Sequence, residues 1–273
     1  LAELEALAAT ASDGIVFTFL QNVDYDALGQ FGLSTGTFTA DGEYFDEAGA
    51  LVVDGQLNET AQNYTYMIGS AWAEMGGRNS ADAVLGNWST SGSPDEAKSN
   101  LTPEEQRERM EAYLQGRVGG YEETEAAFEE AYPNHDFYDL RSLQNAGLDL
   151  ATGSAARALN AKDGQVYSYL SAYTAPYFGG MTMTHTGDIA FFFHSIETAP
   201  YQVHGDEENA YQVADTMASA LASFCEDGDP SIDGLAWEPF GSAEEANTMI
   251  FDVESRCVGR DFNAGLRALL ERQ

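Results

Sequence analysis

The sequence predicts an α/β fold, in which helices cover both faces of a sheet. Two observations lead to this class. Short runs of strand-forming residues alternate along the chain with amphipathic helical segments. In addition, 44% of the 273 residues are hydrophobic, which is enough to fill a sizeable core. No run approaches 18 consecutive apolar residues, so the sequence predicts no membrane-spanning helix.

Three runs of β-branched and aromatic residues are predicted to be strands. The first covers residues 64–69 and ends at Gly69, before small and polar residues. The second, residues 165–173, alternates large apolar side chains with small polar ones, as expected of a strand. The third covers residues 248–253. A loop is expected after each of the first two runs.

Three other segments have helical signals. Residues 102–114 begin with Thr102, a suitable N-cap, and Pro103 fits the first helical position. Residues 212–224 place their large apolar side chains on one stripe before a Gly-Asp-Pro turn, and residues 263–272 form a last amphipathic segment. These helices, interleaved with the strands, complete the α/β pattern.

Charge excludes two classes of partner. The chain has 45 acidic and 12 basic residues, a formal net charge of −33. Such a surface repels phosphate backbones and anionic lipids, so we expect neither nucleic-acid nor membrane binding. The acidic runs are expected to be solvated faces.

The cysteines and four glycan-acceptor sequences bear on the compartment. Cys225 and Cys257 could form one bridge or remain two thiols, and they lack the close spacing of a zinc site. Four Asn-x-Ser/Thr sequences lie between residues 58 and 102. Together these features favour a secreted or extracytoplasmic location.

The four histidines differ in their surroundings. His135 and His204 are expected on loop surfaces, and His194, which follows three phenylalanines, is expected to be a satisfied histidine at an edge. His185 lies in a loop after small residues and glycines, with an acidic residue three positions on and a dense apolar segment behind it. A loop histidine that packs against such an apolar segment could act as a positioned base.

The segment from Thr184 to Phe193 also resembles the histidine loop of the type-B carboxylesterases, the family of cholinesterases and neuroligins. In that loop two residues separate the histidine from an Asp or Glu, and an apolar Phe-x-Phe segment follows. Residues 217–230, 235–240 and 248–252 are similar to the helix, the Gly-Asp-Pro turn, the Trp-Pro-aromatic segment and the strand that follow in the family.

Residues 66–76 resemble the strand and loop that carry the acidic triad member of this family, which would be Glu74. The family usually has Asp before that Glu and Gly directly after it, whereas Ala73 and Met75 stand there in this chain. The order of acid before histidine suits the chain order of α/β-hydrolases. The resemblance therefore implies a Ser-His-Glu triad with His185 as base and Glu74 as acid.

The nucleophile has no satisfactory candidate in the sequence. A Gly-x-Ser-x-Gly match occurs at residues 32–36, around Ser34, but no apolar strand precedes it and no helix follows. We interpret it as a coincidence. The resemblance then implies that residues 1–273 are the C-terminal portion of a single α/β-hydrolase domain, completed by a missing N-terminal half. A half sheet would expose long edges, so we expect a partner chain that carries the nucleophile, in a heterodimer.

These observations lead to three hypotheses on function. The first is a subunit or fragment of a serine carboxylic-ester hydrolase that acts on a small ester, inactive as an isolated chain and with no metal or organic cofactor. The second is a catalytically inactive carboxylesterase-like protein of adhesion or assembly. The third is a self-contained hydrolase that uses Ser34. Asp227, Asp229 and Asp233 do not match an EF-hand and are interpreted as part of a turn.

Overall fold

A computed structural model describes residues 52–53, 56–57, 64–74, 98, 101–143, 145–150, 166–176 and 179–273. All of them belong to one unit of the chain, Val52–Gln273. Ser34, the turn at residues 162–164 and the four glycan-acceptor asparagines lie outside the described residues. The assignment of residues 1–273 to a single domain stays a prediction.

The secondary structure alternates between strands and helices, as the sequence predicts. The strands are β1 (Val52–Val53), β2 (Gln56–Leu57), β3 (Tyr66–Ala71), β4 (Val166–Ser171), β5 (Thr174–Ala175), β6 (Met181–Thr182), β7 (Thr248–Phe251) and β8 (Arg256–Val258). The helices are α5 (Pro103–Leu114), α6 (Tyr121–Ala131), α7 (Asn145–Leu148), α9 (Gly187–Phe192), α10 (Pro200–Val203), α11 (Glu207–Asp227) and α12 (Ala264–Leu270). Short 3-10 helices are η4 (Phe137–Arg141), η7 (Ile196–Thr198) and η8 (Arg260–Asn263).

The main sheet has four described strands in the order β3-β4-β7-β8. β3, β4 and β7 are parallel, and β8 returns antiparallel to β7. Two further pairs, β1–β2 and β5–β6, are antiparallel. Because the carboxyl ends of parallel strands meet at one edge, the loops after β3 and β4 leave the sheet on the same side.

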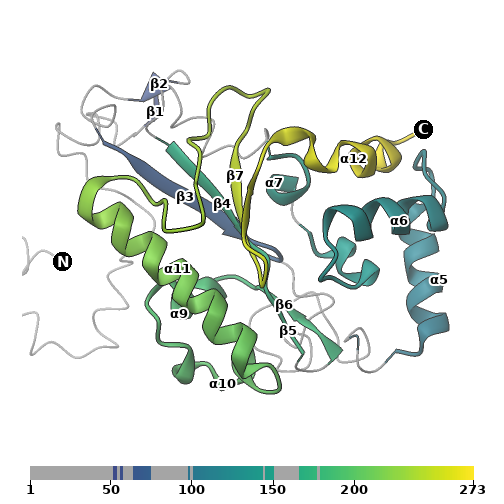
Figure 1. The fold of residues 1–273 in the computed structure, drawn as a ribbon. Helices are drawn as coiled ribbons and strands as arrows, with labels where there is room; N and C mark the ends of the chain where they lie inside the picture. The colour runs from purple at the N-terminus through teal and green to yellow at the C-terminus, as the bar shows by residue number, and fades with distance from the viewer. Residues whose placement is uncertain are drawn as a thin grey trace, which may run out of the picture. The chain divides into compact units, whose positions relative to one another are not determined.

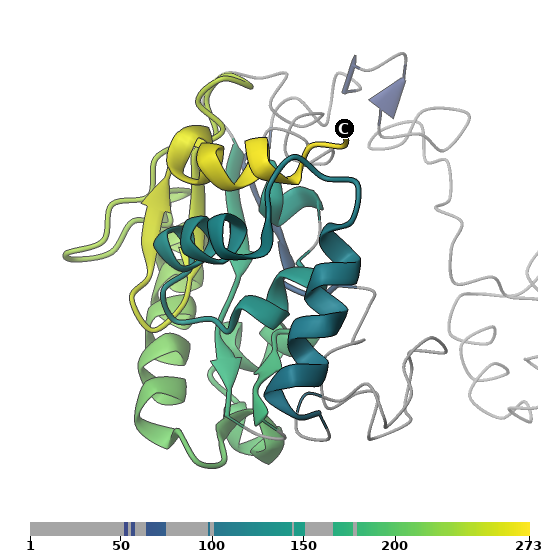
Figure 2. The same cartoon turned by 90° about the vertical axis from the view of Figure 1, so that its right-hand side faces the viewer.

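Helices cover both faces of this sheet. Figure 1 shows α9 and α11 on one side of the strands and α6 and α12 on the other. Figure 2, turned by 90°, places α5, α6 and α12 in front of the sheet and α11 behind it. The prediction of an α/β sheet covered on both faces is therefore confirmed.

Each face has its own aromatic core. On the α11 side, Trp237 packs edge-on against Phe251, with ring centroids 5.3 Å apart. On the α6 side, Trp72 packs edge-on against Phe128 and Tyr132, at 6.2 and 4.9 Å. Burial of such large rings contributes most of the stabilisation of a domain of this kind. Trp72 also follows β3 directly, so this core reaches the end of the strand.

Local signals set several element ends as expected. At α5 the backbone N–H of Glu105 donates to the Thr102 hydroxyl at 3.2 Å, and the Glu105 carboxylate accepts from the Thr102 N–H at 2.8 Å. This is a complete capping box, which satisfies two N–H groups at the helix start. α11 ends at Gly228, which has a φ of +84°, the left-handed conformation that favours glycine.

Other boundaries differ from the sequence-based prediction. β3 continues through Gly69 to Ala71, because Gly69 is needed there for a close strand contact and does not end the strand. α11 begins at Glu207, five residues earlier than the apolar stripe indicates, because its first turn is mostly polar. Within the described part of the chain, no helix is both long and apolar enough to cross a bilayer.

Candidate functional site

The turn that follows β3 holds Glu74. The last residue of β3 is Ala71, and the N–H of Trp72 continues the parallel ladder by donating to the carbonyl of Ser171 at 2.9 Å. The chain then turns, and one carboxylate oxygen of Glu74, Oε2, accepts the backbone N–H of Ala71 at 2.8 Å. This hydrogen bond fixes the carboxylate against the strand end.

The loop after β6 presents His185. The N–H of Ala73 donates to the carbonyl of Met183 at 2.9 Å, and Ala73 and Thr184 form an isolated parallel bridge. This bridge ties the turn of Glu74 to the residue before His185. Thr186 then adopts a left-handed conformation, with a φ of +64°, and α9 begins at the next residue.

His185 and Glu74 meet although 111 positions separate them in the sequence. Nδ1 of His185 lies 2.7 Å from Oε1 of Glu74. Since the carboxylate can only accept, we assign the Nδ1–H tautomer to the neutral imidazole. Nε2 is then the unprotonated nitrogen, and among the described residues it has no hydrogen-bond partner. A neutral imidazole with a free Nε2 can accept a proton.

The pair lies at the surface. The side chain of His185 is 53% exposed and that of Glu74 is 33% exposed. One carboxylate oxygen binds the imidazole and the other binds the backbone, so Glu74 is held from two sides. The structure thus brings together the two residues that the sequence analysis singles out, and their catalytic role stays a prediction.

A second carboxylate lies beside this pair. Asp188, in the first turn of α9, accepts a hydrogen bond from the hydroxyl of Tyr169 at 3.3 Å. Burial raises the pKa of Asp188, and the nearby charge of Glu74 raises it further. Burial also raises the pKa of the Tyr169 hydroxyl. Asp188 is therefore a second carboxyl group close to the pair, and its surroundings disfavour its charged form.

The position of Tyr169 depends on Gly69. These two residues are opposite each other in the parallel register of β3 and β4. A Cβ on Gly69 would lie 2.4 Å from Cγ of Tyr169 and 2.2 Å from its carbonyl oxygen. Only glycine leaves room for that ring. The sequence pattern does not reveal this requirement, because it indicates only that a strand ends at a glycine.

The other histidines lie elsewhere. His194 binds Asp215 of α11 at 2.7 Å and is partly exposed, and His204 is exposed, as expected. His135 was expected on a loop surface, and that expectation is wrong, because its side chain is fully buried. Its ring stacks on Trp72 with a centroid distance of 4.0 Å and an interplanar angle of 8°.

Tyr173 and the aspartates of the Gly-Asp-Pro turn have structural roles. The Tyr173 ring is buried, and its hydroxyl lies 3.2 Å from Oδ2 of Asp206. Carboxylates of Asp227 and Asp229 accept backbone N–H groups two residues on, as in a turn, and within the described ranges no group of three potential ligands could hold a metal.

Both cysteines are free thiols in the structure. Cys225 is exposed on α11, whereas Cys257 is half-buried on β8. Burial raises the pKa of the Cys257 thiol, which disfavours the reactive thiolate. Neither cysteine belongs to the site around His185.

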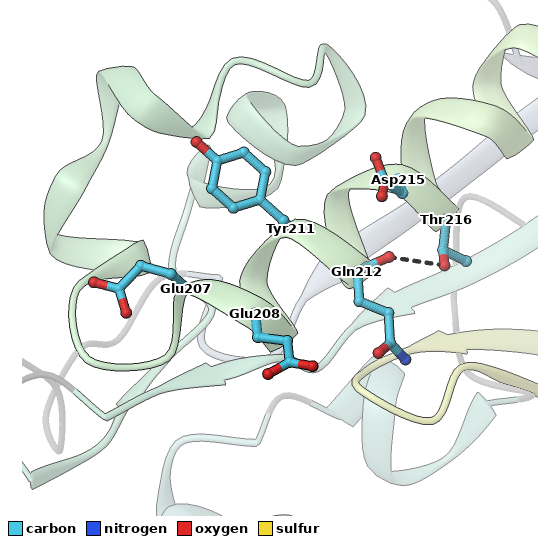
Figure 3. Close-up of a pocket in the computed structure, with 6 residues that line it drawn as sticks. All are labelled: Glu207, Glu208, Tyr211, Gln212, Asp215 and Thr216. Atoms are coloured by element: carbon cyan, nitrogen blue, oxygen red, sulfur yellow. Dashed lines mark hydrogen bonds between the residues drawn. The ribbon is translucent and has the colours of Figure 1, made fainter.

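A shallow pocket lies on the surface of α11 (Figure 3). Its lining is mostly acidic and polar and comes from the first turns of the helix: Glu207, Glu208, Tyr211, Gln212, Asp215 and Thr216. The Thr216 hydroxyl donates to the Gln212 carbonyl at 3.0 Å, a contact within the helix. Its three carboxylates include Asp215, which binds His194 at 2.7 Å, and none of the six lining residues is Glu74 or His185.

Comparison with known proteins identifies the fold. No family model and no curated protein matches the chain. Among solved structures, an esterase from the anaerobe Clostridium hathewayi, described as able to hydrolyse aliphatic aromatic polyesters, matches with a TM-score of 0.61 and 24% identity over 99% of this chain and 50% of its own. A carboxylesterase of Geobacillus stearothermophilus matches with a TM-score of 0.43 and 20% identity, over 77% and 41%.

The chain spans about half the length of the Clostridium esterase. The TM-score of 0.61 shows that the esterase and this chain share a similar overall fold. At this level of identity the likeness concerns the fold. The described part of the chain therefore has an α/β fold similar to that of the Clostridium esterase, and its place in the C-terminal portion of such a domain stays a prediction.

Proposed function

We propose that this chain supplies the acid and the base of a Ser-His-Glu triad in a serine carboxylic-ester hydrolase. The observation that carries the proposal is the contact of 2.7 Å between Nδ1 of His185 and Oε1 of Glu74. The second oxygen of Glu74 is fixed by the Ala71 N–H, so the carboxylate is held in place before any substrate binds. Preorganisation of this kind is what a positioned catalytic pair requires.

The roles of the two residues follow from their hydrogen bond. Glu74 holds the imidazole in the Nδ1–H tautomer and stabilises the imidazolium that forms during reaction. Nε2 of His185 takes the proton of a serine hydroxyl as that oxygen attacks the ester carbonyl. The imidazolium then returns this proton to the departing alcohol, which leaves an acyl-serine. Water, activated by the same Nε2, releases the acid.

The nucleophile is proposed to come from a separate N-terminal carboxylesterase half that carries Gly-x-Ser-x-Gly. Two features of the site support this arrangement. Within the described residues, no serine hydroxyl is hydrogen-bonded to His185. The half-exposed imidazole is also accessible to a second polypeptide. The substrate class is then a small carboxylic ester, whose acyl and alcohol groups the partner chain helps to select.

A fluorophosphonate probe tests the proposal, because it labels only an activated serine. We expect no labelling of the isolated chain, and labelling of the other polypeptide in the natively purified assembly. The assembly should hydrolyse a p-nitrophenyl ester, and His185→Asn should lower this turnover by about 10⁴-fold. Labelling of Ser34 in the isolated chain would instead place the nucleophile in this chain.

The inactive adhesion protein is a separate outcome of the same experiment. In that case the assembly would hydrolyse no p-nitrophenyl ester, and His185→Asn would leave partner binding intact. Thermal unfolding of each variant must be compared with that of the unmodified chain first, since loss of fold would also abolish turnover.

A further inference from the structure

A buried histidine lies next to the turn that carries Glu74. His135 follows α6 and precedes η4, and its side chain has no exposed surface. Burial of an imidazole is costly unless its nitrogens find partners. One nitrogen, Nδ1, lies 3.2 Å from the hydroxyl of Thr174. The other, Nε2, lies 3.4 Å from Oδ2 of Asp252, too long for a well-formed hydrogen bond.

The flat face of this imidazole supports Trp72. The two rings are nearly parallel, with an angle of 8° and a centroid distance of 4.0 Å. The indole N–H of Trp72 donates to the carbonyl of Asp139 at 3.0 Å, so the indole is fixed in its plane as well as against the imidazole. Trp72 is fully buried and lies two residues before Glu74. Trp72 is therefore fixed where the chain leaves β3 and turns toward Glu74.

The edge of the same imidazole contacts the strand pair that leads to His185. Thr174 lies on β5 and is opposite Thr182 of β6 in the antiparallel register. Thr182 precedes His185 by three residues. One ring therefore contacts the elements that carry both members of the predicted pair, Trp72 through its face and Thr174 through Nδ1.

The third side of the imidazole faces Asp252, which follows β7. Oδ1 of Asp252 accepts the N–H of Val253 at 2.8 Å, and Oδ2 lies 3.3 Å from the Asn134 amide nitrogen. Burial alone would raise the pKa of Asp252, but His135 and these hydrogen bonds outweigh it and hold the pKa below its usual value. Asp252 is therefore an anchored carboxylate that faces Nε2 of His135 at 3.4 Å.

We propose that His135 is a positioning residue for the Glu74–His185 pair, acting through its stack on Trp72 and its contact with Thr174. The inference rests on the proposed function, since it concerns the geometry of the same pair. His135 does not touch the reacting atoms. It holds the two elements on which the acid and the base stand, so that the carboxylate of Glu74 meets Nδ1 and not Nε2.

The tautomer of His185 tests this inference without any enzymatic activity. Long-range ¹H–¹⁵N correlation spectra of the full chain at pH 8 report which imidazole nitrogen of His185 holds the proton. We expect the Nδ1–H form to dominate in the unmodified chain. In His135→Phe, which keeps a ring to stack on Trp72 but removes both nitrogens, the ratio of Nδ1–H to Nε2–H forms should fall about tenfold.

Three further variants define the comparison. Glu74→Gln should lower the ratio directly, because it weakens the acceptor for Nδ1–H. Thr174→Val removes one hydroxyl with little change of shape, and it should lower the ratio in the same direction as His135→Phe but by less. His194→Asn removes a surface histidine that also binds a carboxylate at 2.7 Å, and it should leave the ratio unchanged.

The outcomes separate this inference from the proposed function. An unchanged tautomer ratio in both His135→Phe and Thr174→Val would overturn the positioning role. If His135→Phe does not fold, Thr174→Val decides alone, with a lowered ratio supporting the role and an unchanged ratio overturning it. A third outcome is a lowered ratio in His135→Phe and Thr174→Val together with an assembly that hydrolyses no ester. This result would contradict the proposed function but support the positioning role.

Discussion

Two histidine–carboxylate pairs in this chain have the same length but different surroundings. His185 lies 2.7 Å from Glu74 at the carboxyl end of the parallel sheet, and His194 lies 2.7 Å from Asp215 on the surface of α9 and α11. The side chain of Glu74 is 33% exposed, whereas that of Asp215 is 72% exposed. Distance alone therefore does not distinguish a candidate site from an ordinary surface contact.

The difference lies in how each carboxylate is held. Glu74 binds the N–H of Ala71 with its second oxygen, and its turn is bridged to the residue before His185. Asp215 projects from a helix surface, and an exposed pair of this kind gains little because water screens its charges and both side chains lose freedom. The comparison indicates that backbone anchoring creates a preorganised pair. Matched substitutions in the two pairs can test this.

The largest expected effect comes from the two histidines. In the assembled esterase, His185→Asn should lower kcat/KM for a p-nitrophenyl ester by about 10⁴-fold, because it removes the proton acceptor. The same substitution at His194 should leave kcat/KM unchanged. Equal losses in the two variants would contradict the distinction between the pairs.

The carboxylates should follow the same pattern with a smaller effect. Glu74→Gln should lower kcat/KM, but the loss should be roughly 10- to 100-fold smaller than that of His185→Asn, since the orienting acid contributes less than the base. Asp215→Asn serves as the matched control and should leave kcat/KM unchanged. A larger loss for Glu74→Gln than for His185→Asn would argue against the assigned roles.

The scaffold under the predicted pair is tested at Gly69. Gly69→Ala should destabilise the fold by about 1–3 kcal/mol, because the new methyl group overlaps Tyr169 of the adjacent strand. Urea unfolding followed by circular dichroism measures the change. Ser70→Ala, one residue on, adds no Cβ and should change the free energy of unfolding much less. Equal losses in the free energy of unfolding for the two variants would contradict the predicted overlap with Tyr169.

The smallest effect concerns the surface pair and pH. The hydrogen bond to Asp215 raises the pKa of His194 above its ordinary value of about 6.5. A histidine whose folded pKa is raised stabilises the fold fully below its unfolded pKa, and this contribution is lost as pH rises through the folded pKa. Asp215→Asn should therefore melt slightly below the unmodified chain at pH 5.5 and at the same temperature at pH 9. A difference that grows with pH would contradict this sign.

Local sequence signals predicted individual elements well where neighbouring residues decide the structure. The capping box of α5 and the alternation in β4 depend on residues within a few positions of each other. Elements that depend on distant partners were not predicted. β8 forms because it pairs antiparallel with β7, and the short strands β5 and β6 form because they pair with each other.

His135 shows the limit of this reasoning most clearly. Its neighbours Pro133, Asn134 and Asp136 are typical of a surface loop, yet the ring is buried under Trp72, which lies 63 positions earlier. No local pattern encodes that stack, because burial depends on which distant elements cover the loop. The same holds for Tyr169, whose place depends on the glycine opposite it in β3.

The sequence by itself determined the α/β class and the ends of its best-capped helices. It also indicated the two candidate residues, His185 from its loop context and Glu74 from a family resemblance. Only the tertiary structure decided that these residues meet. Glu74 and His185 come together across 111 positions because β3 and β4 run parallel and the bridge of Ala73 with Thr184 joins the segments that follow. Strand register and burial arise between distant segments, and for that reason a linear pattern does not contain them.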